Sequence, residues 1–190
     1  MGSVERAYVA IDVNNLWHSC REIYGRDTRV SYPSLKRLIN GRRYSNLPRQ
    51  LTITAYTVTL SFSKTDNARF LQSLQKLGFI VKTRSMRIEK GLAKPFATDW
   101  DVGITIDAIS DVNTYDTFIL VSGDGDYAML LERLHKLGKR VEVITFQTTA
   151  SSLLHAVADE LVYLTENEVF QDPGRRHGSS DQEDPAPEED

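Results

Sequence analysis

The sequence has little cysteine and no long apolar run, and both absences exclude whole classes of protein. Cys20 is the only cysteine among the 190 residues, so an intrachain disulfide and a zinc site of four thiolates are both excluded. No apolar stretch approaches the roughly 18 residues that a membrane span needs, and the N-terminus lacks the apolar core of a signal peptide. We therefore expect a cytoplasmic protein without a membrane partner.

Histidine is also scarce, and its four copies are scattered along the chain without an HxxxH pair. Any metal ion would then be held by oxygen atoms, which favours Mg²⁺ or Mn²⁺ over zinc. The glycine-containing segment "SGDGDY" lacks the third glycine of a dinucleotide-binding loop, which argues against that class of protein.

The net charge of −3 conceals an uneven distribution of charge along the chain. Residues 171–190 carry seven acids and two arginines and are rich in Pro, Ser and Gly, so they have too little apolar surface to fold. We predict a single domain over residues 1–170 followed by a disordered acidic tail over 171–190. The tail is a candidate site for a protein partner.

Two stretches of the predicted domain carry a local excess of positive charge. Residues 21–49 hold eight Lys and Arg against two acids, and residues 82–94 hold five against one. Such an excess indicates a polyanionic partner, although an ordinary solvated face has the same composition. The cations that we assign to a nucleic-acid backbone are Arg42, Arg43, Arg84, Arg87, Lys90 and Lys94.

Buried strands and amphipathic helices alternate along the chain. The strands lack clean alternation of polar and apolar residues, which is typical of a parallel sheet covered on both faces. This pattern predicts a three-layer α/β/α sandwich with a central parallel sheet. The predicted strands are 6–12, 50–59, 79–85, 116–122 and 140–146, with a short last strand near 161–164, and the predicted helices are 65–77, 99–112 (capped by Thr98), 126–137 and 150–159.

Aspartates fall where these elements begin and end. Asp12 ends the first strand, Asp124 and Asp126 follow the fourth, and Asp101 lies at the start of a helix. Ligands of an open parallel sheet bind outside the carboxyl ends of its strands, so we expect these side chains to share one crevice. Carboxylates packed closely repel one another, and a divalent cation relieves the repulsion. Such oxygen-rich sites suit metal-assisted hydrolysis of phosphodiesters.

Each aspartate also has a purely structural interpretation. Asp101 could favour the dipole of its helix, and Asp124 could cap the helix that follows it. Asp12 is harder to explain in this way, because an unpaired charge at the end of a buried strand is costly. Taken together, the three favour a metal site over coincidence.

Several neighbouring polar residues are weaker candidates. Asn15 could bond a metal ligand or a water, whereas Asn14 is better explained as a turn residue. Ser122 could bond a phosphate oxygen or satisfy its own turn. Asp107 lies six residues beyond Asp101, about 120° away around the helix, and therefore ranks below the other acids.

Four segments resemble the conserved blocks of NYN domains, and in particular the bacterial LabA-like group within the PIN-like nuclease superfamily. They are "IDVNNL" with Asp12 and Asn15, "KPFATDWDVGITIDAI" with Asp101 and Asp107, "LVSGDGDYAMLLERLHKLGKRVEVI" with Asp124 and Asp126, and "SSLLHAVADELVYL". Departures from the family pattern are the bulky "KPFATDW", which aligns Lys94 poorly with the family lysine, and Tyr127 in place of the usual Phe.

The resemblance implies a PIN-like fold with strand order 3-2-1-4-5, which places the first and fourth strands side by side. It also implies a ribonuclease with Mg²⁺ or Mn²⁺ on Asp12, Asp101, Asp124 and Asp126, acting on single-stranded RNA by metal-activated water. The products would carry a 3′-hydroxyl and a 5′-phosphate. Trp17, Trp100 or Tyr127 could stack on a base or simply pack against the protein.

Other readings of the sequence stay open. A regulator with this fold could bind RNA or protein with little catalysis, because fold alone does not establish activity. Homo-oligomerisation is compatible with either. A haloacid-dehalogenase phosphatase needs an acid where Asn14 stands, and a Toprim domain needs a glutamate where Asp12 stands, so both are disfavoured.

Overall fold

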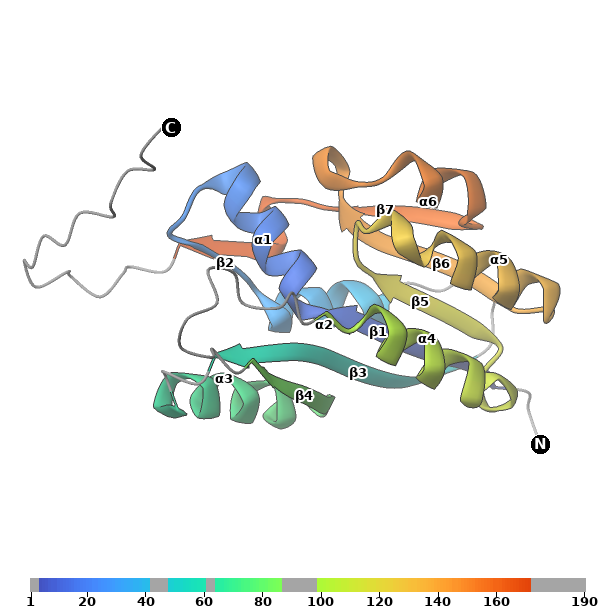
Figure 1. Cartoon of the computed structure of the whole chain (residues 1–190), viewed down its shortest axis with the longest axis horizontal. Coiled ribbons are helices and arrows are strands. Elements are labelled where there is room, and N and C mark those ends of the chain that lie inside the picture. Colours follow the sequence, from blue (N-terminus) through green and yellow to red (C-terminus); the bar gives the residue numbers. More distant parts are fainter. Residues whose placement is uncertain (1–3, 42–47, 61–63, 87–98, 172–190) are drawn as a thin grey trace, which may run out of the picture.

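A computed structural model describes residues 4–41, 48–60, 64–86 and 99–171, and its centre is a six-stranded parallel sheet. The strands follow the order β4-β3-β1-β5-β6-β7 (Figure 1). Their bounds are β1 Glu5–Asp12, β3 Arg49–Leu60, β4 Ile80–Met86, β5 Thr117–Val121, β6 Arg140–Phe146 and β7 Glu160–Leu164. The predicted order of the first five strands is confirmed, and the short last strand adds β7 at the edge.

Helices cover both faces of the sheet and complete the predicted three-layer α/β/α sandwich (Figure 1). One apolar core lies between the sheet and the first three helices, and a second lies between the sheet and the last three. The first group is α1 Val13–Tyr24, α2 Tyr32–Gly41 and α3 Lys64–Lys76, and the second is α4 Asp101–Ser110, α5 Ala128–Lys136 and α6 Ser152–Val157.

Alternation along β1 decides which way the side chain of Asp12 faces. Val9 and Ile11 belong to the core beneath α1–α3, whereas Tyr8 and Ala10 belong to the core beneath α4–α6. Successive side chains of a strand point to opposite faces, so Asp12 continues the row of Tyr8 and Ala10. It therefore ends β1 on the side of the sheet that carries α4 and α5.

The direction of the strand order reverses between β1 and β5. The chain builds outward from β1 through β3 to β4, then crosses to β5 and continues through β6 to β7. Strands β1 and β5 pair in parallel, with Ile11 opposite Val121, so Asp12 and the residues after β5 leave the sheet at the same edge. This is the switch point at which ligands of open α/β sheets bind.

Asparagines at the start of α1 fasten this edge to both neighbouring strands. Asn14 Oδ1 accepts a hydrogen bond of 2.8 Å from the amide of Val58 in β3. Asn15 Oδ1 accepts one of 2.9 Å from the amide of Gly123, just after β5. The turn after Asp12 is therefore tied on two sides, and Asn14 acts within the scaffold rather than facing a ligand.

Several boundaries differ from the sequence-based expectation. The helix predicted over 99–112 begins at Asp101, with Trp100 at its N-cap and no side-chain cap bond, and Thr98 lies outside the described residues. The helix predicted over 126–137 starts with a 3₁₀ turn, Gly125–Tyr127, before α5.

The sequence analysis also missed a second, two-stranded sheet. Within it, β2 (Thr28–Val30) pairs antiparallel with β8 (Val169–Gln171). Gln171, the first residue of the predicted acidic tail, therefore ends a strand, and residues 172–190 lie outside the described part of the chain.

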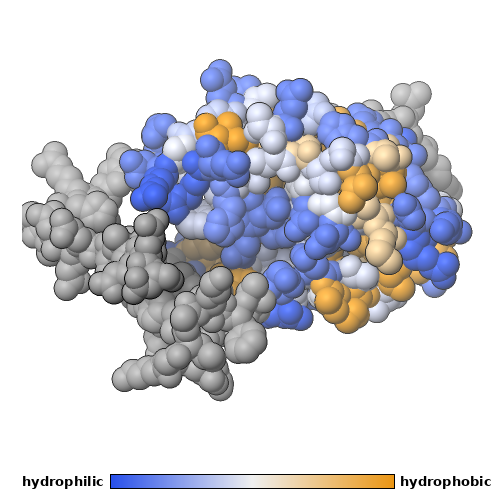
Figure 2. Space-filling view, turned by 45° about the horizontal axis from the view of Figure 1, so that its top comes forward, coloured by the Kyte–Doolittle hydropathy of each residue, from blue (hydrophilic) through white to orange (hydrophobic). Residues whose placement is uncertain are grey.

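The helices and the surface of the described residues bear on whether the chain meets a membrane. None of the helices described is both long enough and apolar enough to cross a bilayer. On the face drawn in Figure 2, apolar side chains form separate patches within a largely hydrophilic surface. The most exposed apolar side chains include Val102, Ile106 and Met129.

The tie between Asn14 and β3 predicts a measurable loss of stability. Asn14→Ala leaves the half-buried amide of Val58 without its acceptor, so we expect a loss of about 1–3 kcal/mol in the free energy of unfolding. Urea denaturation followed by circular dichroism measures it. Asn113→Ala is the matched control, because Asn113 is exposed and only its backbone oxygen accepts a bond. Equal stability of the two variants would contradict the assigned role.

Candidate metal centre

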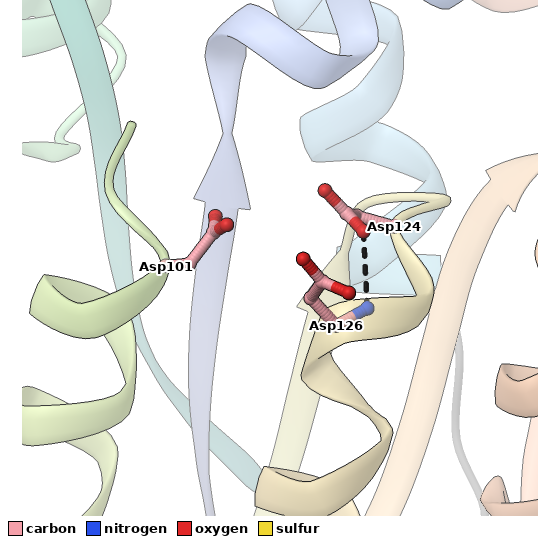
Figure 3. Close-up of side chains that lie close together, drawn as sticks. All are labelled: Asp101, Asp124 and Asp126. Atoms are coloured by element: carbon pink, nitrogen blue, oxygen red, sulfur yellow. Dashed lines mark hydrogen bonds between the residues drawn. The ribbon is translucent and has the colours of Figure 1, made fainter. Parts of the chain in front are cut away.

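Three aspartates from two separate segments converge at the switch point. One oxygen each from Asp101, Asp124 and Asp126 can be chosen so that all three lie within 4.8 Å of one another. Figure 3 shows Asp101 reaching in from the start of α4, while Asp124 and Asp126 extend from the turn after β5. The end of β1 lies between these two segments (Figure 3).

The turn after β5 holds its two aspartates by bonds of its own. Asp124 Oδ1 accepts from the amide of Asp126 at 3.0 Å, so Asp124 caps the 3₁₀ turn as one structural interpretation predicted. The buried Ser122 Oγ accepts from the amide of Asp124 at 3.2 Å, which satisfies the turn. These bonds leave Asp124 Oδ2 and both oxygens of Asp126 without a hydrogen bond to any described residue.

Glycines on either side of Asp124 are required by close packing. A Cβ at Gly123 would lie 2.6 Å from the backbone oxygen of Thr149, and one at Gly125 would lie 2.4 Å from Ser151 Oγ. The turn is thus pressed against the segment between β6 and α6. The spacing of "GDGD" follows from this contact, because only the aspartate positions have room for a side chain.

Asp12 lies next to this group and contacts it through a tyrosine. Its Oδ1 accepts from the amide of Asn15 at 3.0 Å and so caps α1. Its Oδ2 lies 3.2 Å from the hydroxyl of Tyr127, and the same hydroxyl lies 2.8 Å from Asp101 Oδ1. Asp12, Tyr127 and Asp101 therefore form one connected row.

A single hydroxyl proton cannot satisfy two ionised carboxylates. Tyr127 has one O–H to donate, yet it faces an oxygen of Asp12 and an oxygen of Asp101. Either one carboxyl carries a proton, or positive charge from elsewhere must compensate the pair. The site is thus short of positive charge in the residues that build it.

The pKa values of the same carboxyls reflect this shortage. Burial raises the pKa of Asp12 to about 6, and the nearby charges of Asp101 and Asp124 push it in the same direction. Burial also raises the pKa of Asp101, with further increases from the carboxylates of Asp99, Asp124 and Asp126. Within the described residues, no Lys or Arg forms an ion pair with these aspartates.

This donor set fits a divalent cation. Hard carboxylate oxygens match the ligand preference of Mg²⁺ and Mn²⁺. The one cluster of potential metal ligands found in the described ranges contains neither histidine nor cysteine, and Cys20 is buried in the α1–α3 core. A cation would relieve both the repulsion among the acids and the missing proton at Tyr127.

Asp107 lies outside this group, as its angular offset on the helix predicts. Its Oδ2 accepts from Lys82 Nζ at 2.6 Å and from the hydroxyl of Tyr56 at 2.6 Å. Tyr56 in turn lies 2.6 Å from the hydroxyl of Tyr8. Asp107 thus fastens α4 to β3 and β4 and helps to fix the position of Asp101 at the other end of the helix.

The predicted substrate-binding cations are only partly described. Arg84 lies beside the site, with its guanidinium 4.4 Å from the ring centre of Trp100. Its Nη1 donates to the backbone oxygen of Asp99 at 2.9 Å. Trp100 itself donates from Nε1 to the Thr57 oxygen at 2.9 Å. Arg42, Arg43, Arg87, Lys90 and Lys94 lie outside the described residues.

Comparison with known proteins assigns the chain to a family. The NYN domain profile matches residues 6–165. The chain belongs to the NYN domain family. The matched residues include every aspartate of the site. They also include all six strands of the sheet, apart from Glu5 at the start of β1.

Relatives of this NYN domain agree with the assignment. The low amplitude and bright protein LabA of Synechococcus elongatus is 25% identical over 169 residues, which cover 87% of each protein. A crystal structure of a protein of unknown function from Vibrio parahaemolyticus superposes with a TM-score of 0.72 at 29% identity, covering 87% of this chain and 96% of that one. The predicted LabA-like, PIN-like assignment is confirmed.

Sequence reasoning weighed base stacking against packing for Tyr127 and favoured packing, but it missed the role of the hydroxyl. The ring is buried, with 1% of its surface exposed, so it offers no free face to a base. Its hydroxyl instead joins two acids. The signal was present, since Tyr stands where the family usually has Phe, and the added hydroxyl needs a partner when it is buried.

The raised pKa of Asp12 predicts that removing its charge stabilises the metal-free protein. A carboxyl whose folded pKa is raised weakens folding as the pH rises from its ordinary value through about 6, and the penalty is fully present above that. Asp12→Asn should therefore gain about 1–3 kcal/mol at pH 8 in EDTA, and the gain should shrink below pH 6.

Urea denaturation at several pH values tests this expectation. Asp116→Asn is the control of opposite sign, because the hydrogen bond from Arg6 lowers the pKa of the Asp116 carboxyl, and removing this acid should not stabilise the protein at pH 8. A loss of stability in Asp12→Asn at pH 8 would show that burial does not penalise the charge of Asp12.

Proposed function

We propose that this NYN domain is a metal-dependent ribonuclease that hydrolyses phosphodiester bonds of single-stranded RNA. The observation that supports it is the convergence of Asp101, Asp124 and Asp126 beside the buried Asp12, at the switch point of the sheet. Membership of a family of PIN-like nucleases supplies the reaction class. The reaction would leave a 3′-hydroxyl and a 5′-phosphate, because water rather than a 2′-hydroxyl attacks.

Mg²⁺ or Mn²⁺ is the proposed cofactor, held by Asp101, Asp124 and Asp126, with Asp12 completing the negative charge of the site. When bound, such an ion lowers the pKa of a coordinated water and neutralises charge that develops on the scissile phosphate. Asn15 serves as a positioning residue, because its side chain ties the turn after β5 to the end of β1.

The remaining residues orient the acids and the RNA. Tyr127 fixes Asp12 and Asp101 relative to each other through one hydroxyl. Asp107 and Lys82 anchor the helix that carries Asp101. Arg84, exposed on β4 beside Trp100, supplies positive charge for the RNA backbone next to the acids. Ser122 supports the turn after β5 from inside.

A regulator that binds RNA without cutting it is the alternative that the sequence leaves open. It would need the basic surface but not the acidic cluster. Carboxylates that repel one another without a ligand weaken folding, so their convergence at the switch point favours a bound cation, which the enzyme needs and the regulator does not. Cleavage and binding assays on the same variants distinguish the two.

Loss of one candidate ligand should slow cleavage strongly. With Mg²⁺ or Mn²⁺ and 5′-labelled single-stranded RNA, we expect Asp124→Asn to lower the cleavage rate by at least about 100-fold, because a metal ion supplies several kcal/mol of transition-state stabilisation. Asp111→Asn, an exposed acid just beyond the far end of α4, is the control and should cut like the wild type. Gel electrophoresis of the products measures both rates, and EDTA should stop the wild type.

Duplex RNA and DNA serve as parallel substrates in that assay, and cutting them as fast as single-stranded RNA would contradict the proposed substrate. Cleavage that survives both EDTA and Asp124→Asn would contradict the proposed site. RNA binding without cleavage at any metal concentration would favour the regulator.

Metal binding should also be visible without any substrate. At 100 times its Kd an ion stabilises the folded state by about 2.7 kcal/mol, which corresponds to a rise in melting temperature of roughly 5–10 °C for a domain of this size. We expect this rise with Mn²⁺ or Mg²⁺ in the wild type and Asp111→Asn, but not in Asp124→Asn. Differential scanning calorimetry measures it, and an equal rise in all three proteins would refute this site.

A further inference from the structure

Two arginine–tryptophan stacks lie within the described chain. They differ in how many of their polar groups form hydrogen bonds with the rest of the protein. In each, the guanidinium carbon lies 4.4 Å from the centre of the indole ring. One is Arg84 over Trp100, just before α4, and the other is Arg21 over Trp17, within α1. Only in the first do both side chains donate hydrogen bonds to described residues.

Trp100 and Arg84 are both held in place by hydrogen bonds to backbone oxygens. Trp100 donates from Nε1 to Thr57, packs edge-on against Tyr56 with ring centres 5.3 Å apart, and leaves no room for a Cβ at Gly103. Arg84 donates to the backbone of Asp99. This stack is therefore part of the architecture that places Asp101.

Trp17 and Arg21 have hydrogen-bond donors that no described residue accepts. Trp17 is 37% exposed, and among the described residues its Nε1 makes no hydrogen bond. Arg21 donates only from Nε, to the oxygen of Arg26 at 2.9 Å, which orients the guanidinium and leaves its two terminal nitrogens without a protein acceptor in the described chain. The ring of His18 lies edge-on to Trp17, with centres 4.6 Å apart.

These side chains line a shallow, open hollow of about 500 Å³, which we call the Trp17 pocket. Its volume is within the roughly 300–1,000 Å³ typical of small-ligand clefts. The residues that line it are Trp17, His18, Arg21, Glu22 and Arg26. Two arginines against one glutamate give this lining a net positive charge.

The pocket lies on α1 and the turn after it, and this helix starts at the edge of the sheet that carries the acids. α1 begins directly after Asp12, and Trp17 follows Val13 by four residues, or about 6 Å along the helix axis. Asn14, Trp17, His18 and Arg21 share one face of the helix, because residues three and four apart are neighbours on a helix surface. Asn14 bonds to the end of β3, so this face looks toward the β3 side of the site.

We propose that the Trp17 pocket binds one nucleotide of the RNA strand next to the cleavage site. This proposal rests on the proposed ribonuclease function for the position of the scissile phosphate. The base stacks on the Trp17–Arg21 pair, since aromatic and guanidinium planes both accept unpaired bases. The terminal nitrogens of Arg21, with Arg26, bond the phosphate. Duplexed bases are already stacked and cannot enter, which makes this pocket a determinant of single-strand preference.

Binding of a labelled single-stranded RNA 12-mer to protein carrying Asp124→Asn, in Mg²⁺, tests the pocket without cleavage. Adding Trp17→Ala should weaken binding by roughly 5- to 150-fold, which is the range for loss of one base–aromatic stack. Adding Trp17→Phe should stay within about threefold of the parent, because a phenyl ring retains the stack. Fluorescence anisotropy gives the affinities.

Controls separate stacking from charge and from folding. Leu137→Ala removes an apolar side chain with the same 37% exposure at the end of α5, outside the pocket, and should leave the affinity unchanged. Arg21→Ala should lower the slope of log affinity against log salt by about one, whereas Trp17→Ala should leave that slope unchanged. Melting temperatures report on folding of every variant.

The outcomes also distinguish this proposal from the one on which it rests. If the wild type cuts RNA but Trp17→Ala binds RNA as tightly as its parent, the pocket assignment fails and the ribonuclease stands. The pocket assignment also fails if an abasic 12-mer loses as much affinity as the RNA on Trp17→Ala. If Trp17-dependent binding persists while the wild type cuts nothing, the ribonuclease proposal fails and the pocket stands.

Discussion

Repulsion among carboxylates at one edge of a parallel sheet is the constraint around which this NYN domain is built. Asp12, Asp101, Asp124 and Asp126 come from three segments of the chain and meet without a basic partner in the described residues. A folded protein keeps such an arrangement only when the surrounding structure is rigid enough to impose it. The positions of the acids therefore indicate a rigid scaffold as well as a metal-binding chemistry.

The scaffold meets this demand with neutral hydrogen bonds. Asn14 and Asn15 join the start of α1 to the strands on either side, and Tyr127 links Asp12 to Asp101 through its hydroxyl. Amide and phenol groups position carboxylates without neutralising them, whereas a lysine in the same place would remove the charge that a cation needs. Lys82, the basic residue of the described ranges that bonds α4, does so at Asp107, away from the cluster.

Most of the fold was predictable from sequence because it depends on long apolar runs. The strand that ends at Asp12 and the strand before Ser122 are buried on both faces, and such apolar runs can be recognised in the sequence alone. The strand order came from the family resemblance rather than from the pattern. The three-residue strands β2 and β8 were missed, since so short a pairing depends on tertiary contact and leaves almost no periodicity.

The candidate site was predictable in its residue types and less so in its contacts. Positions at strand ends identified Asp12 and Asp124, and helical geometry separated Asp107 from Asp101. No local pattern could show that Lys82 would reach Asp107 across two elements, or that Trp100 would begin α4 by donating to Thr57. Such contacts join residues 25 and 43 positions apart, and only the folded chain brings them together.

The pairing of β2 with β8 has a practical consequence for handling the protein. Gln171 lies opposite Thr28, two positions after Arg26 of the Trp17 pocket, so a dye attached at Gln171 itself starts beside that pocket. β1 begins at Glu5 and ends at Asp12, roughly 23 Å away at strand spacing. A label meant to leave the acids undisturbed therefore belongs near Glu5, at the end of β1 that lies away from them.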